Sequence, residues 1–96
     1  MNNVNIQSLH FTANQNLKDF ITEHVSKLSH FNNRIMGTDV CLKLDKSDTD
    51  ENKVCEIKLI APGKDFFAER RCESFEEAVR QTVHALREQI SKHKFS

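Results

Sequence analysis

The chain combines two kinds of hydrophobic spacing, and their order limits the folds that it can adopt. Two segments place apolar residues three and four positions apart, as amphipathic helices do, and three segments between them alternate apolar and polar residues, as half-buried strands do. Another alternating run, residues 4–10, precedes them. The order predicts an α+β fold, β-α-β-β-β-α, with a four-stranded mixed sheet and two helices packed on one face. The length of 96 residues predicts one domain, residues 1–96.

The first helical segment begins after Asn14, a residue that favours the N-cap position, and continues for about 17 residues. Its apolar stripe contains Leu17, Phe20, Ile21, His24, Val25, Leu28 and Phe31. We expect Phe20 to lie in the core and to face the sheet. A histidine in such a stripe is more often a partly buried core residue than a catalyst, so His24 is interpreted as structural.

The second helical segment covers residues 74–94, and Glu77 follows Ser74 by three residues, as in a capping box. Its apolar face contains Phe75, Val79, Val83, Leu86 and Ile90. We expect Leu86 to pack against the sheet. The three alternating segments predict strands at 38–45, 53–61 and 66–72, separated by an acidic loop at 46–52 and a turn at 62–65.

The sequence lacks the motifs of common catalytic and cofactor sites. It contains no nucleophilic triad signature, P-loop, HExxH or GxGxxG, and its 2 glycines cannot build a glycine-rich phosphate cradle. The cysteines Cys41, Cys55 and Cys72 lie far apart, without the spacing of a zinc site. No apolar run reaches membrane-spanning length, and no secretory signal is visible. We therefore expect a cytoplasmic, non-enzymatic protein with reduced thiols, no metal, no cofactor, no membrane partner and no small-molecule substrate.

The net charge is zero, yet the charges are distributed unevenly along the chain. Residues 45–56 hold five acids and two bases, whereas residues 80–96 hold four bases and one acid. Arg80, Arg87 and Lys94 recur at seven-residue intervals along one flank of the last helix, and Lys92 extends the cluster. A basic helix edge of this kind can present positive charge to phosphates.

The first helix adds Lys27, and the last strand adds the adjacent Arg70 and Arg71, which must point to opposite faces of the sheet. On spacing alone, two interpretations of these cations remain open. They can form a solvated edge, with Lys92 and Lys94 near the negative end of the helix dipole, or they can contact RNA phosphates. The absence of Trp and Tyr argues against base stacking on the sheet.

The same residues resemble the ribosome hibernation-promoting factors, a family that includes the ribosome-associated translation inhibitors. The resemblance rests, in this order, on 17–21 (LKDFI), 25–28 (VSKL), 40–44 (VCLKL), 74–79 (SFEEAV) and 85–94 (ALREQISKHK). It covers essentially the whole chain, and the final KHK after an arginine-bearing helix is its most specific element.

The resemblance implies the fold given above and a mechanism of occupancy. Family members bind the small ribosomal subunit in the channel for mRNA and tRNA, contact ribosomal RNA through basic helix surfaces, and silence translation in stationary or starved cells. The chain resembles a short form without the added domain of long forms, and is expected to inhibit translation without pairing ribosomes by itself. By position, the resemblance implies RNA contacts from Lys27, Arg80, Arg87, Lys92 and Lys94, and secondarily from Arg70 or Arg71.

Two other functions are compatible with parts of the pattern. A general double-stranded-RNA-binding module also places two helices on one face of a short sheet. A small α/β enzyme of the acylphosphatase type needs a phosphate-binding loop with an arginine near the first strand, and residues 8–16 contain no arginine. Ribosome sedimentation tests the first alternative, and a phosphatase assay tests the second.

Overall fold

The helices and strands follow one another in the order that the sequence predicts. The computed structural model describes residues 3–31, 34–45 and 50–93. Its elements are β1 (Asn3–Leu9), α1 (Gln15–Phe31), β2 (Gly37–Leu44), β3 (Lys53–Ala61), β4 (Lys64–Cys72) and α2 (Phe75–Lys92). The predicted α+β fold is therefore confirmed, with boundaries that differ from the expected ones by one or two residues.

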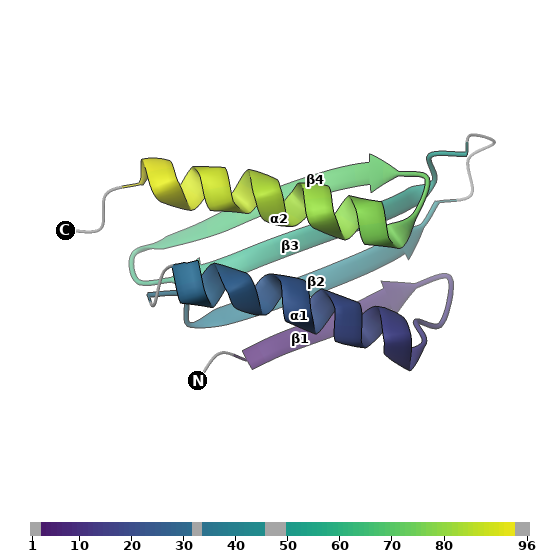
Figure 1. Ribbon diagram of the computed structural model, residues 1–96, viewed down its shortest axis with the longest axis horizontal. Coiled ribbons are helices and arrows are strands. Elements are labelled where there is room, and N and C mark those ends of the chain that lie inside the picture. The colour runs from purple at the N-terminus through teal and green to yellow at the C-terminus, as the bar shows by residue number, and fades with distance from the viewer. Residues whose placement is uncertain (1–2, 32–33, 46–49, 94–96) are drawn as a thin grey trace.

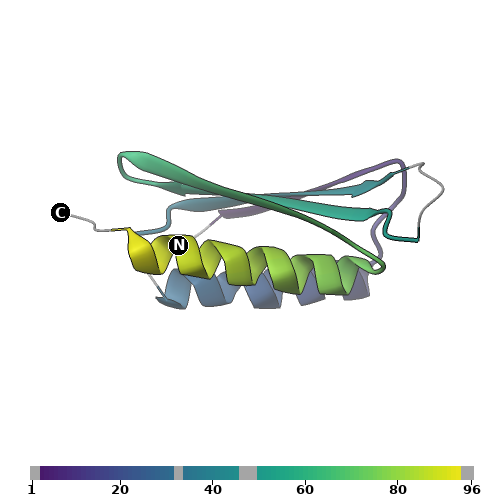
Figure 2. The same cartoon turned by 90° about the horizontal axis from the view of Figure 1, so that it is seen from above.

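The four strands form one mixed sheet in the order β1-β2-β3-β4. β1 and β2 are parallel because α1 crosses over between them, and the two later pairs are antiparallel. Both helices cover the same face of the sheet, as Figure 2 shows, and they run side by side in the same direction (Figure 1). The described helices leave the opposite face of the sheet uncovered, so the molecule presents two unlike surfaces.

Side-chain caps fix where both helices begin. The Asn14 Oδ1 atom accepts a hydrogen bond from the backbone N–H of Leu17 at 2.8 Å, and the Ser74 hydroxyl accepts one from the backbone N–H of Glu77 at 3.1 Å. Each bond satisfies an N–H group that a helix N-terminus leaves without a partner. The Glu77 carboxylate accepts from the Gln81 amide at 3.2 Å. Neither of the described helices has the length and apolar character needed to cross a membrane.

The hairpin between β3 and β4 is tighter than the sequence pattern suggests. Ala61 pairs with Lys64, which leaves Pro62 and Gly63 as a two-residue turn. Gly63 has a φ of 77°, a conformation that glycine adopts at low cost because it lacks a Cβ atom. The expectation that the turn extends to Asp65 is wrong, because this residue already pairs with β3 in the ladder.

The core lies between the sheet and the two helices. Inward residues of β2 and β3, among them Leu42 and Ile57, are fully buried. Leu86 of α2 is also fully buried, as predicted. Thr82 belongs to the same buried face, and its hydroxyl donates to the Ala78 carbonyl at 2.7 Å, so the polar group is satisfied.

Phe20 departs from the prediction that it faces the sheet. The buried residues of α1 are Leu17, Ile21, Val25 and Leu28. Phe20 is only partly buried and packs at the margin of this core, where it meets a side chain of α2. The prediction is wrong because the broad apolar stripe of α1 has two neighbours, with one flank toward the sheet and the other toward α2.

The three cysteines lie in strands, as the sequence pattern predicts. Cys55 is fully buried beneath the helices, and burial raises the pKa of its thiol to about 12. Cys72 is also buried, whereas Cys41 is half-buried on the uncovered face of the sheet. Among the described residues, no three His, Cys, Asp or Glu side chains gather as a metal-ligand set.

Candidate nucleic-acid interface

The flank of α1 that lies beside α2 carries aromatic and basic side chains. Phe20, His24, Lys27 and Phe31 follow one another at intervals of four, three and four residues, which places them on one line along the helix. Phe20 and His24 are half-buried, whereas Lys27 and Phe31 are exposed. This line is separate from the buried line that faces the sheet, although the sequence presents both as one stripe.

Phe20 is covered by one side chain from each helix. The Phe20 and His24 rings lie 4.1 Å apart between centroids, at an interplanar angle of 28°. The guanidinium carbon of Arg80, from α2, lies 5.2 Å from the Phe20 centroid. The His24 Nδ1 atom lies 2.9 Å from the Phe20 carbonyl oxygen, which fixes the imidazole over the ring. A cation over an aromatic face contributes about 0.5–1 kcal/mol at an exposed site, so the contact also joins the two helices.

Two more aromatic contacts lie along the seam between the helices. The Arg87 guanidinium carbon lies 4.9 Å from the ring centroid of Phe31, the last residue of α1. The rings of Phe11 and Phe75 stack at 4.5 Å near the start of both helices. Because the helices run in the same direction (Figure 1), these contacts follow the seam from its N-terminal to its C-terminal end.

Cations on this seam have few carboxylate partners. We use the name interhelical strip for the surface formed by Phe20, His24, Lys27, Phe31, Arg80 and Arg87. Within the described ranges, no carboxylate oxygen lies within 4.0 Å of the Lys27 or Arg87 nitrogens. Arg80 approaches Glu77 at 3.6 Å, but both side chains are about half exposed, and such pairs contribute about 0–1 kcal/mol. The positive charge of the strip is therefore available to the phosphates of a partner.

The structure brings part of the predicted contact set together. Three of the predicted cations lie on the interhelical strip, namely Lys27, Arg80 and Arg87. Arg71 projects from the uncovered face of the sheet, where it forms an ion pair with Asp45 at 2.6 Å. Lys94 lies outside the described residues.

The other two predicted cations lie on the flank of α2 that faces β4. Lys92 shares a hollow with Lys64 and Gln89 beside the β3–β4 turn. Arg70 donates a hydrogen bond to the Glu69 carbonyl oxygen at 2.7 Å and lies in a second hollow, which Arg80 of the strip also lines together with Glu77 and Glu88. Lys92 can therefore form a second contact region, whereas Arg70 borders the strip through Arg80.

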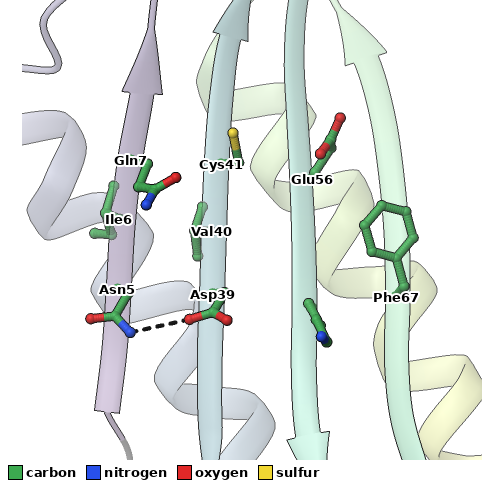
Figure 3. A pocket seen from close by; sticks show the side chains of 9 residues that line it. Asn5, Ile6, Gln7, Asp39, Val40, Cys41, Glu56 and Phe67 are labelled. Carbon is green, nitrogen blue, oxygen red and sulfur yellow. Dashed lines mark hydrogen bonds between the residues drawn. The ribbon is translucent and has the colours of Figure 1, made fainter.

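The uncovered face of the sheet has a different electrostatic arrangement. Each of three cations there lies near a carboxylate: Lys43 near Glu56 at 2.6 Å, Lys58 near Asp65 at 3.5 Å, and Arg71 near Asp45 at 2.6 Å. Figure 3 shows the centre of this face, where polar side chains, Cys41 and the ring of Phe67 line a hollow. Because these cations are already paired, the face offers less positive charge to an external phosphate than the strip does.

Two carboxylates face each other at the centre of the uncovered face. Glu56 of β3 is the ladder partner of Glu69 of β4. The hydrogen bond with Glu56, together with burial, raises the pKa of the Glu69 carboxyl. The hydrogen bond from the Lys43 ammonium holds the pKa of the Glu56 carboxyl below its ordinary value. The pair adds negative charge to this surface and makes it a poor site for phosphate.

The rings of the strip are not among the candidates that the sequence pattern indicates. Their helical spacing is also that of a core stripe, and the chain has seven phenylalanines that compete for that role. A usable signal is the position of Lys27, which lies on the same line as Phe20 and Phe31. A line that mixes an exposed cation with rings is typical of a helix edge rather than of a buried face.

Comparison with known proteins gives a family match over nearly the whole chain. Residues 4–95 match the family described as "Sigma 54 modulation protein / S30EA ribosomal protein", whereas no curated protein sequence matches. A ribosomal subunit interface protein from Coxiella burnetii has a TM-score of 0.83 at 14% identity, over 94% of both chains. The N-terminal domain of Thermus thermophilus Protein Y has a TM-score of 0.83 at 17% identity, over 98% of this chain and 100% of that chain. At these identities, the structural likeness shows a shared fold.

Proposed function

The chain belongs to the sigma 54 modulation protein / S30EA ribosomal protein family, and from this premise we propose that it binds the ribosome and silences translation. The match confirms the family resemblance that the sequence predicts. The proposed partner is the ribosomal RNA of the small subunit, in the channel that mRNA and tRNA use. The proposed activity is binding without catalysis or cofactor, in the cytoplasm of stationary or starved cells.

The interhelical strip is the observation that carries this proposal. Arg80 and Arg87 lie over aromatic rings, and Lys27 lies on the same seam. Lysine and arginine near phosphates release condensed counterions, and this release supplies most of the sequence-independent affinity for nucleic acid. The strip therefore supports binding to an RNA surface by shape and charge, with no need for a base-specific code.

The proposed mechanism is steric occupancy. A folded body measuring 45 × 24 × 17 Å fills space that mRNA and tRNA need, so the ribosome cannot decode while the protein is bound. Reversal then depends on release of the protein, and release becomes faster as salt weakens the phosphate contacts. Lys92, on the other flank of α2, and Arg70, whose hollow Arg80 also lines, can contact a second RNA segment in the same channel.

Co-sedimentation with separated ribosomal subunits tests the proposal. We expect the purified protein to pellet with small subunits, and bound mRNA and initiator tRNA to reduce its binding. We also expect protein synthesis in a cell-free extract to stop at about one protein per ribosome. Binding to large subunits alone, or binding that mRNA and tRNA do not affect, would contradict occupancy of the channel.

Two further measurements address specificity and physiology. A 16-base-pair RNA duplex is the probe for the double-stranded-RNA alternative, since about that length spans one such module. We expect much weaker binding to this duplex than to small subunits at the same salt concentration. In a lysate of starved cells, blotting of gradient fractions should place the protein with ribosomal particles, and its absence from them would contradict the physiological part of the proposal.

A further inference from the structure

One ring of the interhelical strip remains open at the surface. Phe31 is 42% exposed, and its one ring contact within the described part of the chain is the Arg87 guanidinium at 4.9 Å. Single exposed apolar side chains are common on proteins, so exposure alone does not mark a site. The exposure of Phe31 becomes informative when it is compared with Phe20, a ring on the same helix that other side chains cover.

Phe20 and Phe31 lie on the same flank of α1 but are covered differently. Phe20 contacts both the His24 ring, one turn later, and the Arg80 guanidinium. Phe31 has the corresponding guanidinium, from Arg87, but it is the last residue of α1. Because the helix ends there, α1 has no residue one turn further along that can cover Phe31 as His24 covers Phe20.

The residue that corresponds to His24, four positions after the ring, does not supply that cover for Phe31. Ile35, four residues later, is buried in the core rather than placed on the ring. Among the described residues, none covers Phe31 as His24 covers Phe20, so this side of the ring is available to a partner. A flat group with a π face fits this position, and a nucleobase stacks well on an aromatic ring or on a guanidinium plane.

Charges next to the ring favour a nucleotide over other flat groups. Lys27 lies one turn before Phe31 on the same flank of α1, and Arg87 lies against the ring from α2. Neither cation has a carboxylate within 4.0 Å in the described part of the chain. A ring between two such cations can hold a base while the cations neutralise the adjoining phosphates.

We infer that one unpaired nucleobase of RNA stacks on the open side of the Phe31 ring, which Arg87 backs from α2, while Lys27 contacts the adjoining phosphate. We call this arrangement the clamp. The inference rests on the proposed function, since the RNA of the small ribosomal subunit supplies the base. It adds base stacking to the electrostatic contacts between cations and phosphates. Removal of a side chain that contacts a phosphate lowers the salt dependence of binding, whereas removal of a ring on which a base stacks leaves the salt dependence unchanged.

The test is the affinity of Phe31 variants for purified small ribosomal subunits over a series of salt concentrations. Phe31→Leu keeps an apolar side chain but removes the flat ring, so we expect binding to weaken about 5- to 100-fold, as for one stacked base. The slope of log affinity against log salt should stay at the wild-type value, because no charge is removed. Phe31→Tyr restores a ring and should recover wild-type affinity.

Two other variants keep the test independent of any effect on folding. Arg87→Lys retains the charge but loses the planar guanidinium, so binding should weaken with an unchanged slope. Phe67→Leu is the matched control, since Phe67 is 54% exposed on the uncovered sheet face, and it should bind as the wild type does. Thermal melting verifies that each variant is folded.

The outcomes separate the clamp from the proposed function. If small subunits bind the wild type and a folded Phe31→Leu variant equally well, the clamp is overturned and ribosome binding stands. A fall in slope for Phe31→Leu also overturns the clamp, because a stacked ring contributes no counterion release. If the wild type does not bind ribosomal subunits at all, the proposed function fails and the clamp fails with it.

Discussion

The two broad faces of this protein surround their cations with different groups. On the uncovered sheet face, Lys43, Lys58 and Arg71 each lie within 4.0 Å of a carboxylate. On the interhelical strip, Arg80 and Arg87 lie over aromatic rings, and of these two only Arg80 has a carboxylate within 4.0 Å among the described residues, that of Glu77 at 3.6 Å. An aromatic ring attracts a cation but carries no net charge, so the positive charge is still felt by a distant phosphate. A nearby carboxylate carries a negative charge that largely offsets the positive charge at that distance. A chain with zero net charge can therefore still present one cationic surface.

The rings also hold the cations of the strip in place before a partner arrives. An arginine side chain free in solvent loses rotamer entropy when it binds, at a cost of about 0.5–1.5 kcal/mol for each immobilised side chain. Arg80 and Arg87 already rest on Phe20 and Phe31, so part of this cost is met on folding. The same contacts give a role to the rings at the edge of α1, which lie outside the buried core.

The largest expected effect is on stability, and it tests whether the helices have a buried core line that is distinct from the interhelical strip. Leu86→Ala removes a fully buried side chain and should lower the free energy of unfolding by about 2–5 kcal/mol. Phe20→Ala removes a half-buried ring and its stacking contacts, and should cost about 1–2 kcal/mol. Urea denaturation measures both values. A loss for Phe20→Ala as large as that for Leu86→Ala would place Phe20 in the core after all.

A smaller effect tests whether α1 contributes to the cationic surface. Lys27→Gln should weaken binding to small ribosomal subunits and lower the slope of log affinity against log salt by about one. Lys18→Gln is the matched control, because Lys18 is an exposed lysine on the opposite flank of the same helix. The control should leave both affinity and slope unchanged. Equal effects of the two variants would show that binding depends on overall charge rather than on the strip.

The smallest effect concerns the carboxylate pair on the uncovered sheet face. Because folding raises the pKa of Glu69, its protonated form stabilises the fold at low pH, and this stabilisation is lost as the pH rises through the raised pKa. Glu69→Gln imitates the protonated form at every pH. The variant should be more stable than the wild type by roughly 0.2–1 kcal/mol near neutral pH, the scale of one cross-strand pair.

The pH dependence of this difference is the check. Well below the ordinary glutamate pKa of about 4.3, where the wild-type carboxyl is protonated in both folded and unfolded chains, the two melting temperatures should converge. Curves of melting temperature that stay parallel from acidic to neutral pH would show that Glu69 and Glu56 do not interact in solution. Ribosome binding should be the same for the variant and the wild type, since the pair lies away from the strip.

Most of the fold can be predicted from local patterns, because each pattern has a local physical cause. Asn14 and Ser74 mark the helix starts through side-chain caps, and period two marks the strands. The extent of the β3–β4 turn is harder to predict, because polar residues such as Asp65 suit both a turn and an exposed strand position. Pairing with β3 decides between them, and pairing is not a local property.

The candidate site is less predictable because it depends on what each helix flank faces. A stripe that includes both Ile21 and Phe20 has the period of a single broad face, and only the position of α2 divides it. The alternation of Arg70 and Arg71 is predictable, but which of them points toward the helices depends on the sheet. Lys92, five residues after Arg87, lies on the other flank of α2, a difference that helical spacing alone could reveal.

The central claim is that position on the interhelical strip, rather than net charge, determines ribosome binding. The most direct measurement compares two double variants that each remove two positive charges, Arg80→Gln with Arg87→Gln and Lys58→Gln with Arg71→Gln. Binding to purified small ribosomal subunits is measured across a salt series. The strip variant should bind more weakly with a slope lower by about two, whereas the sheet-face variant should match the wild type. Equal losses in both variants, or a larger loss in the sheet-face variant, would contradict the claim.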